Sequence, residues 1–277
     1  MNENPLISII IPCYNDAQYI EQSVQSALDQ TYHNKEIIVV DDGSNIKTKA
    51  VLKKLEPKIA KLITQENQGQ SKARNVGINE AKGNYILVLD SDDFFEPTFC
   101  EKAIAFFLEN KDVQLVTCEA NLLHIDGSVE IYKPKGGTIS NFMYANDALG
   151  TSLFVKEDWQ KIGGYDESMR KGFEDWEFFI RLLKNGGKCY VIPEILYSYR
   201  KRNDSTTSKA NNNRYTLLNY IYLKHKEIYI ADFDNFVAKL LELSSLQEKN
   251  RLKILKKIDY KLGNMILKPV RFIKSLF

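Results

Sequence analysis

The chain has 277 residues, of which 44% are hydrophobic and 27% are charged, and its formal net charge is +2. This composition is that of an ordinary soluble protein with room for one large α/β domain, or a domain with an appendage, and the near-neutral charge gives no support to a nucleic-acid partner. The apolar run at the N-terminus is about five residues long, too short for a signal sequence, and no stretch of about 18 apolar residues occurs. We therefore expect a protein without a transmembrane segment.

The four cysteines are widely scattered and form no CxxC pair. They stand at Cys13, Cys100, Cys118 and Cys189, and three of them lie in or beside apolar runs. We therefore expect reduced thiols in the core of a cytoplasmic protein.

Strand and helix patterns alternate through the first 120 residues. The strand patterns cover 6–11, 35–44, 60–65, 84–93 and 113–120, and helical patterns lie between them at 15–30, 47–55, 69–83 and 98–110. Asn15 or Asp16 is expected to cap the first helix, and Pro97 to open the last of the four. This order is typical of βαβ units, so we predict an α/β fold with a mostly parallel central sheet flanked by helices. Ligands of such sheets bind beyond the carboxyl ends of the strands.

The second half of the sequence is less regular. Residues 120–147 have the pattern of a hairpin and loop, and residues 151–167 run from a strand through a short helix to a Gly-Gly turn. An amphipathic helix opened by acids is predicted over 172–186, followed by an extended segment over 188–200. From residue 210 the pattern is helical. We therefore expect a catalytic domain over 1–209 and a helical extension over 210–277.

Acidic residues gather where two of the predicted strands end. Asp41 and Asp42 end one strand, and Asp90, Asp92 and Asp93 end another. In a parallel sheet these ends can lie side by side, and a cation such as Mg²⁺ or Mn²⁺ would relieve the repulsion between the carboxylates. The alternative is that the second group only caps the following helix, but a cap needs one acid. Neither GxGxxG nor the P-loop pattern occurs, so these two nucleotide-binding motifs have no support.

Six segments appear in the order and at the spacing of a known family. They are SIIIPCYN, EIIVVDDGS, NQGQSKARNVGI, YILVLDSDD, GGYDE and GFEDWEFFIRL, and with them the chain resembles the family 2 glycosyltransferases over residues 6 to about 205. The resemblance implies an inverting enzyme with the GT-A nucleotide-sugar fold, of the type that builds bacterial polysaccharides, capsules or glycoprotein glycans. It also implies a UDP-sugar donor, a glycan or lipid-linked saccharide acceptor, and a divalent metal, Mn²⁺ or Mg²⁺.

The resemblance assigns nucleotide-binding roles to residues at the strand ends. Pro12 and Tyr14 would line the pocket of the base, and Asp42 would accept a hydrogen bond from the ring N–H of the base. Gly69 would form the turn beside the base, and Arg74 would meet the anionic nucleotide near the start of its helix. For Asp42 an alternative stays open, since DDGS is also a common turn sequence.

The segment Asp90-Ser91-Asp92 resembles the DxD motif of the family. Asp90 would contact the ribose, Ser91 counts among the nucleotide-binding residues, and Asp92 would ligate the metal that bridges the two phosphates. A metal there stabilises the negative charge of the nucleoside diphosphate as it leaves. We expect Asp93 to cap the following helix.

The segment GFEDW resembles the ED motif of the family. The matching residue, Asp175, would act as the base that takes the proton from the acceptor hydroxyl. Glu174 and Asp175 can also be read as acids that complement the dipole of their helix, and the two interpretations are compatible.

One position departs from the family pattern. Many relatives carry a histidine in a late YRxHxxS stretch, where it can serve as a further metal ligand, but this chain has YRKRNDS, with Arg202 at that position. Arginine stays protonated and does not ligate a cation. Asp92 is then the chief protein ligand, or another residue replaces the histidine. Arg200 or Arg202 would instead hold the diphosphate.

The end of the chain is strongly basic. Residues 249–277 contain nine Lys or Arg residues and one acid, Asp259. Leu, Ile and Phe alternate with the lysines at roughly helical spacing, which is typical of a helix that lies on an anionic membrane surface, here the inner face of the cell membrane. A packed helix with a solvated basic face, or a homodimer contact, are the alternatives.

Two other functions compete with the glycosyltransferase. A sugar nucleotidyltransferase predicts a glycine-rich, basic loop after the first strand, where this chain has PCYND. A non-catalytic nucleotide-sugar-binding protein predicts loss of the motif acids, yet Asp92 and Asp175 are both present. The sequence therefore favours a metal-dependent, inverting glycosyltransferase.

Overall fold

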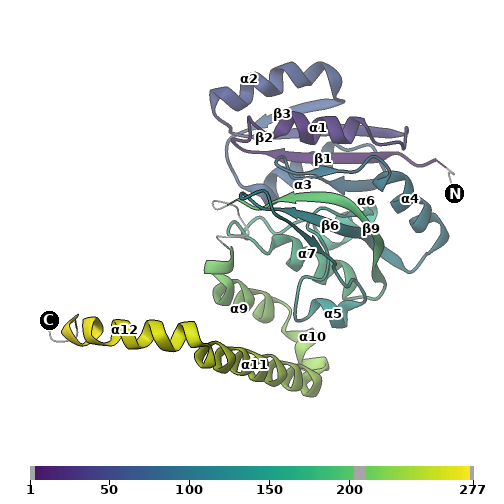
Figure 1. The fold of residues 1–277 in the computed structure, drawn as a ribbon. Helices are drawn as coiled ribbons and strands as arrows, with labels where there is room; N and C mark the ends of the chain where they lie inside the picture. Colours follow the sequence, from purple (N-terminus) through teal and green to yellow (C-terminus); the bar gives the residue numbers. More distant parts are fainter. Residues whose placement is uncertain (1–3, 203–209, 275–277) are drawn as a thin grey trace. The chain divides into compact units, whose positions relative to one another are not determined.

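The computed structural model describes residues 4–202 and 210–274. The chain divides into two compact units, Met1–Ile221 and Tyr222–Phe277, which are described separately (Figure 1). Residues 203–205, the last part of the YRKRNDS stretch, lie outside the described residues.

The first unit is built on one mixed sheet. In the described part of the chain its strands are β1 (Ile7–Cys13), β2 (Lys35–Asp42), β3 (Lys61–Gln65), β4 (Tyr85–Val88), β5 (Phe94–Phe95), β6 (Val113–Leu123), β7 (Val129–Tyr132), β8 (Leu153–Val155) and β9 (Lys188–Arg200). The strand order is β3-β2-β1-β4-β8-β6-β9-β5, and β7 pairs with β6. Strands β1 to β4 pair in parallel, as do β6 and β9, whereas β5, β7 and β8 run antiparallel to their neighbours. The predicted α/β fold with a mostly parallel sheet is confirmed.

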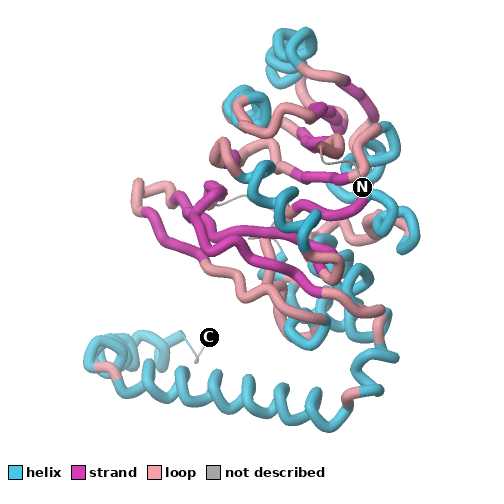
Figure 2. The backbone as a smooth tube through the Cα atoms, turned by 90° about the vertical axis from the view of Figure 1, so that its right-hand side faces the viewer, coloured by secondary structure: helices cyan, strands magenta, loops and turns pink. Residues whose placement is uncertain are grey.

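Helices cover both faces of this sheet (Figure 2). They are α1 (Ile20–Leu28), α2 (Ile46–Leu55), α3 (Gln70–Glu80), α4 (Phe99–Glu109), α5 (Ile139–Phe142), α6 (Lys156–Ile162) and α7 (Glu174–Leu183). Ile9 and Ile11 of β1 share a core cluster with residues of α1, α2 and α4. Ile10, which points the other way, lies against α3, where a Cβ added to Gly77 would come within 2.5 Å of its side chain. Every residue of β1 is buried, which explains its continuous apolar sequence.

The register of the parallel strands aligns their carboxyl ends. Cys13 of β1 pairs with Asp41 of β2, and Ile10 of β1 pairs with Val88 of β4. The acids at the end of β2 and those that follow β4 therefore lie at the same edge of the sheet, on either side of the end of β1. The predicted placement of the site at this edge rests on that register.

The expected cap of the first helix is wrong. Helix α1 begins at Ile20, and its N-cap residue, Tyr19, makes no side-chain capping hydrogen bond. Asn15 instead adopts a left-handed conformation with φ of 62° and accepts a hydrogen bond from the Asn45 N–H at 2.8 Å. The Asp16 carboxylate is engaged elsewhere, as described below. Residues 14–19 thus connect β1 to the helix.

The C-terminal part of the chain is helical, as predicted, throughout the described residues to 274. Its helices are α9 (Arg214–Lys224), α10 (Lys226–Ala231), α11 (Phe233–Lys256) and α12 (Ile258–Lys274). The first unit extends to Ile221, twelve residues beyond the expected end of the domain at 209, because Leu217 and Ile221 of α9 are buried and the Tyr220 hydroxyl donates to Asp166 at 2.7 Å. Within the described segments, none of the helices is both long enough and apolar enough to cross a membrane.

All four cysteines are buried free thiols, as expected. Burial raises the pKa of Cys13 and of Cys100 to about 12. These thiols are therefore protonated packing groups rather than nucleophiles.

Candidate active site

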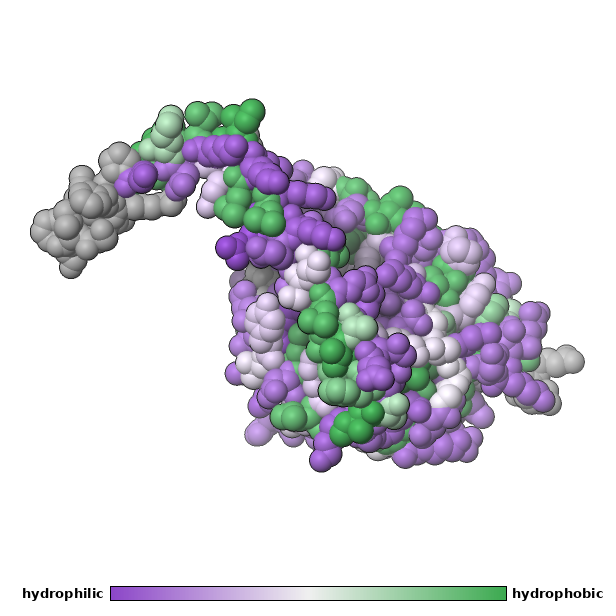
Figure 3. Space-filling view, turned by 90° about the horizontal axis from the view of Figure 1, so that it is seen from below, coloured by the Kyte–Doolittle hydropathy of each residue, from purple (hydrophilic) through white to green (hydrophobic). Residues whose placement is uncertain are grey.

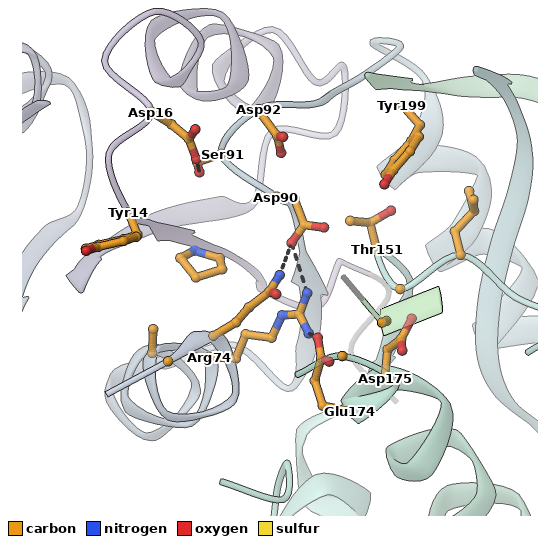
Figure 4. A pocket seen from close by; sticks show the side chains of 18 of the residues that line it. Tyr14, Asp16, Arg74, Asp90, Ser91, Asp92, Thr151, Glu174, Asp175 and Tyr199 are labelled. Carbon is orange, nitrogen blue, oxygen red and sulfur yellow. Dashed lines mark hydrogen bonds and ion pairs between the residues drawn. The ribbon is translucent and has the colours of Figure 1, made fainter. Parts of the chain in front are cut away.

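A cleft of about 790 Å³ opens beyond the carboxyl ends of β1, β2 and β4 (Figure 4). Its walls come from these strand ends, the first turns of α3 and α7, the loop over 146–151 and the end of β9. Of the residues predicted from the sequence, those that line it are Pro12, Tyr14, Asp42, Gly69, Arg74, Asp90, Ser91, Asp92, Asp175 and Arg202.

Asp42 organises the loop that follows β3. Its Oδ1 accepts hydrogen bonds from the Gln65 side chain at 2.7 Å and from the Gln68 N–H at 2.9 Å. Its Oδ2 accepts from the Asn67 side chain at 3.1 Å and from the Gly69 N–H at 2.8 Å. All four donors are uncharged amide groups of the residues over 65–69. Asp42 therefore shapes this end of the cleft.

Gly69 closes the same loop and begins α3. Its φ is 95°, a conformation that favours glycine, and a Cβ there would stand 3.1 Å from Nε of Arg170. Pro12 is buried at the end of β1, whereas Tyr14 at the rim is 50% exposed. Both residues line the cleft, and half of the Tyr14 side chain is exposed there.

Arg74 is buried between two carboxylates. Its Nη2 pairs with Asp90 Oδ1 at 2.9 Å and its Nη1 with Glu174 Oε1 at 2.8 Å, while only 2% of its side chain is exposed. The guanidinium also lies 5.3 Å from the ring centre of Tyr165. These contacts give Arg74 a positioning role between the two carboxylates, and because it also lines the cleft, its contact with the nucleotide stays a prediction. Figure 4 shows it joining the end of β4 to the start of α7.

The segment after β4 is held from both sides. Asp90 Oδ1 also accepts from the Gln70 side chain at 2.9 Å, and the Ser91 hydroxyl donates to Asp16 Oδ2 at 2.6 Å. Ser91 is buried, and its hydroxyl holds the segment in place through this hydrogen bond to Asp16. Asp16, which the sequence reasoning treated only as a helix cap, is the partner that fixes this segment. Its position three residues after the end of β1 was a signal that it belongs to the acidic edge.

Asp92 lies beside a positively charged side chain, that of Arg202. Its Oδ2 lies 3.2 Å from Nε of Arg202, and Nη1 of Arg202 is 2.7 Å from Asp16 Oδ1. Burial and the negative charge of Asp90 raise the pKa of Asp92 to about 6, against the opposing charge of Arg202. Asp92 is therefore a carboxylate whose charge is incompletely compensated.

Asp93 does not cap a helix, contrary to expectation. Its Oδ2 accepts from the Tyr197 hydroxyl at 2.6 Å and its Oδ1 from the Arg200 N–H at 2.7 Å, and it is buried. Helix α4 begins six residues later, at Phe99, without a side-chain cap. Asp93 thus ties the segment after β4 to strand β9.

Arg200 is not among the residues that line the cleft, so its position gives no support to the expectation that it holds the diphosphate. Its guanidinium is 5.0 Å from the ring centres of Tyr19 and Phe94, and it donates to the carbonyl of Asp92 and to the Gln22 side chain. Of the two arginines proposed for that role, Arg202 is the one that reaches the cleft. Arg200 is the last residue of β9, whereas Arg202 lies beyond the end of that strand.

Asp175 stands at the start of α7, across the cleft from the strand ends. Its Oδ2 accepts from the Asn146 side chain at 2.9 Å, and its Oδ1 accepts from the N–H of Trp176 at 2.8 Å. A Cβ added to Gly150 would come within 2.7 Å of Oδ2, so the adjoining loop closes tightly on the carboxylate. Burial raises the pKa of Asp175 above the usual value, and Arg74 opposes the shift. Neither Asn146 nor Gly150 carries a motif by which the sequence could have identified it.

The chain is similar to known proteins over most of its length. Residues 8–152 match the family described as Glycosyl transferase family 2, and residues 139–204 match the N-terminal domain of galactosyltransferase. An uncharacterized glycosyltransferase of Haemophilus influenzae is 42% identical over 205 residues, which cover 71% of this chain and 77% of that protein. The putative teichuronic acid biosynthesis glycosyltransferase TuaG of Bacillus subtilis is 33% identical over 213 residues, covering 75% and 83%.

Two further similarities are more partial. The hyaluronan synthase of Pasteurella multocida is 29% identical over 284 residues, which cover 99% of this chain but only 28% of the synthase. The crystal structure of S. aureus TarS 1-349 in complex with UDP-GlcNAc shares the fold, with a TM-score of 0.62 and 24% identity over 73% of this chain and 60% of that one.

The extent of these matches defines the class of the protein. The family match covers more than half of the chain, and this chain covers more than two thirds of relatives over 30% identical to it. The chain therefore belongs to glycosyltransferase family 2 and is a glycosyltransferase with a GT-A-like fold. The nucleotidyltransferase and the non-catalytic binding protein are set aside.

Proposed function

We propose that this glycosyltransferase transfers a sugar from a UDP-sugar to a hydroxyl of a glycan or lipid-linked acceptor, with inversion at the anomeric carbon. One observation carries the proposal. Asp175 and the Asp90–Asp92 segment come from distant parts of the chain yet line one cleft, and Arg74 joins them through Glu174 and Asp90. The UDP-GlcNAc bound to TarS, which shares the fold, supports the choice of a UDP-sugar.

The end of the cleft at Tyr14 and Asp42 suits the base of the nucleotide. The exposed ring of Tyr14 offers a face for stacking, and the loop held by Asp42 gives a fixed polar wall. Asp42 already accepts four hydrogen bonds from this loop. In our proposal the ring N–H of uracil takes the place of one of the side-chain donors, Gln65 or Asn67, so that the carboxylate stays saturated.

The described residues fit a divalent cation that takes most of its ligands from the substrate. Among them, no three acidic, histidine or cysteine side chains gather to hold a metal, so a cage built wholly by protein is excluded for this part of the chain. Mg²⁺, however, commonly takes one or two carboxylates and completes its shell with phosphate oxygens and water. Asp92, with its incompletely compensated charge, meets that requirement. Asp92 would hold the ion, which when bound would stabilise the leaving diphosphate.

Arg202 occupies the position where many relatives have histidine, and here it contributes charge rather than ligation. Its guanidinium pairs with Asp16 and Asp92. When the donor binds, the same guanidinium can turn to the diphosphate oxygens, with which it forms charge-assisted hydrogen bonds. This exchange would free Asp92 at the moment when the diphosphate arrives.

Asp175 supplies the base in this proposal. Its two hydrogen bonds, from Asn146 and the Trp176 N–H, hold the carboxylate in one orientation. The acceptor oxygen forms a bond to the anomeric carbon as Asp175 takes its proton, and the bond from that carbon to the UDP oxygen breaks with its electron pair. A raised pKa makes the carboxylate a better proton acceptor near neutral pH.

A panel of UDP-sugars tests the proposal. Each is incubated with the full chain and Mn²⁺, and donor hydrolysis and thermal stabilisation are measured. We expect one or a few UDP-sugars to be hydrolysed slowly and to raise Tm, while the corresponding GDP-sugars do neither. Equal or greater stabilisation by GDP-sugars would overturn the assignment of a UDP donor.

A further inference from the structure

The C-terminal unit exposes a long apolar surface. None of the described side chains of α11 is buried, and those of α12 that are described are also largely exposed (Figure 3 shows green apolar groups beside purple polar ones on this extension). The exposed apolar residues include Leu241, Leu246, Leu252, Ile254, Ile258, Leu262, Met265 and Ile266. Isolated exposed leucines are common, but a run of this length calls for a partner.

In α12 these side chains fall on one face. Ile258, Leu262, Met265 and Ile266 follow the spacing i, i+4, i+7, i+8, and they are 72%, 49%, 68% and 69% exposed. At about 100° per residue they share one side of the helix, whereas Leu267 lies on the opposite side. The same rotation per residue places Lys261 and Lys268 along one edge of the apolar face, and both side chains are exposed. The helix thus has an apolar stripe bordered by positive charge.

The charge of this segment identifies its partner. Residues 249–277 hold nine Lys or Arg residues and one acid. A second copy of the same segment would bring like charges together, whereas an anionic lipid surface is complementary to both the stripe and its basic border. In the described residues no helix is long and apolar enough to span a membrane, so an α12 in contact with lipid would lie along its surface.

We propose that α12 is an interfacial helix that binds anionic membrane surfaces. Its apolar face enters the boundary between headgroups and acyl chains, and its lysines contact the negatively charged headgroups. This inference does not depend on the identity of the donor sugar or on the metal. It would bring a lipid-linked acceptor and the enzyme to the same surface.

Vesicle sedimentation with the full chain tests this proposal. The protein is mixed with vesicles of phosphatidylcholine alone and with vesicles that also contain phosphatidylglycerol. We expect binding only to the anionic vesicles, weakened by added salt because salt screens the attraction. Replacing Lys257, Lys261 and Lys268 together by Gln should lower the affinity about a hundredfold, since each cation near an anionic surface contributes about fivefold.

A matched pair of variants separates insertion from charge alone. Met265→Gln places a polar group in the middle of the apolar face and should weaken binding about tenfold. Leu267→Gln makes a comparable change at a residue that is 46% exposed on the opposite face, and should leave binding unchanged. Helix content by circular dichroism checks that both variants remain folded.

The proposal fails if the full chain does not sediment with anionic vesicles, or if Met265→Gln and Leu267→Gln have equal effects. It also fails if the chain is a dimer in analytical ultracentrifugation and Met265→Gln converts it to a monomer, because the apolar face would then belong to a homodimer contact. Equal binding to both kinds of vesicle would exclude the role of the lysines.

Discussion

Asp42 ends β2 and Asp92 follows β4, the two strands on either side of β1. Both acids lie at the same edge of the sheet, yet their surroundings differ. Asp42 accepts four hydrogen bonds from the loop over 65–69, all of them from uncharged amide groups. Asp92 has the guanidinium of Arg202 at 3.2 Å and the like charge of Asp90 nearby, and its pKa is raised to about 6. One carboxylate is satisfied by its own loop, and the other is not.

This difference separates two uses of an acidic residue. A carboxylate saturated by neutral donors fixes the shape of a pocket, and its removal disturbs the fold. A carboxylate with incomplete compensation attracts a cation, and its removal disturbs binding instead. Asp175 shares with Asp92 a raised pKa and a place on the cleft, but in our proposal it accepts a proton, so its removal should disturb transfer rather than binding.

The largest effect is expected from Asp175→Asn. An amide cannot take the acceptor proton, so transfer should fall about 10²- to 10⁴-fold, the usual contribution of a general base. UDP binding, measured by calorimetry, should stay within about twofold, since the change is nearly isosteric. Transfer at the wild-type rate would reject Asp175 as the base.

Asp42→Asn tests the structural half of the comparison. An amide nitrogen would face one of the donors of the loop, so we expect the free energy of unfolding in urea to fall by about 2 kcal/mol. Asp92→Asn is the matched control. It should not lower stability, because a raised pKa means that burial already disfavours the charged form. The comparison breaks if the two variants lose the same free energy.

A smaller effect is expected when Arg202, the positively charged residue beside Asp92, is replaced. Arg202→Gln takes away the charge that competes for Asp92, so Mn²⁺ titrated without nucleotide should bind about tenfold more tightly. Lys201→Gln removes an equal charge from a neighbouring residue that also lines the cleft, and it should change the affinity little. An unchanged affinity in Arg202→Gln would mean that Arg202 does not compete with the cation.

The sequence predicted the parts of the fold that depend on local pattern. The strands β1, β2 and β4 contain continuous apolar runs, and their parallel pairing could be expected to bring Asp42 and Asp92 to one edge. The resemblance to the ED motif also pointed to Asp175, which lines the cleft although it lies far along the chain from the acids at the strand ends.

The errors concern side chains whose partners are distant in the chain. Asp93 was expected to cap the next helix, but Tyr197 and the Arg200 N–H bind it, more than a hundred residues away. The ion pair of Arg74 with Glu174, also a hundred residues away, was likewise not predicted, whereas its contact with a nucleotide stays a prediction. Local sequence cannot reveal such pairs, because nothing in the neighbouring residues distinguishes a helix cap or surface cation from a buried tertiary contact.

The main proposal is that Asp92 binds a cation that arrives together with the donor. It is tested most directly by calorimetry of UDP binding with and without Mn²⁺, in the wild-type chain and in Asp92→Ala. We predict that Mn²⁺ strengthens UDP binding to the wild-type chain and has no effect on the variant. The same strengthening by Mn²⁺ in both proteins would contradict the claim.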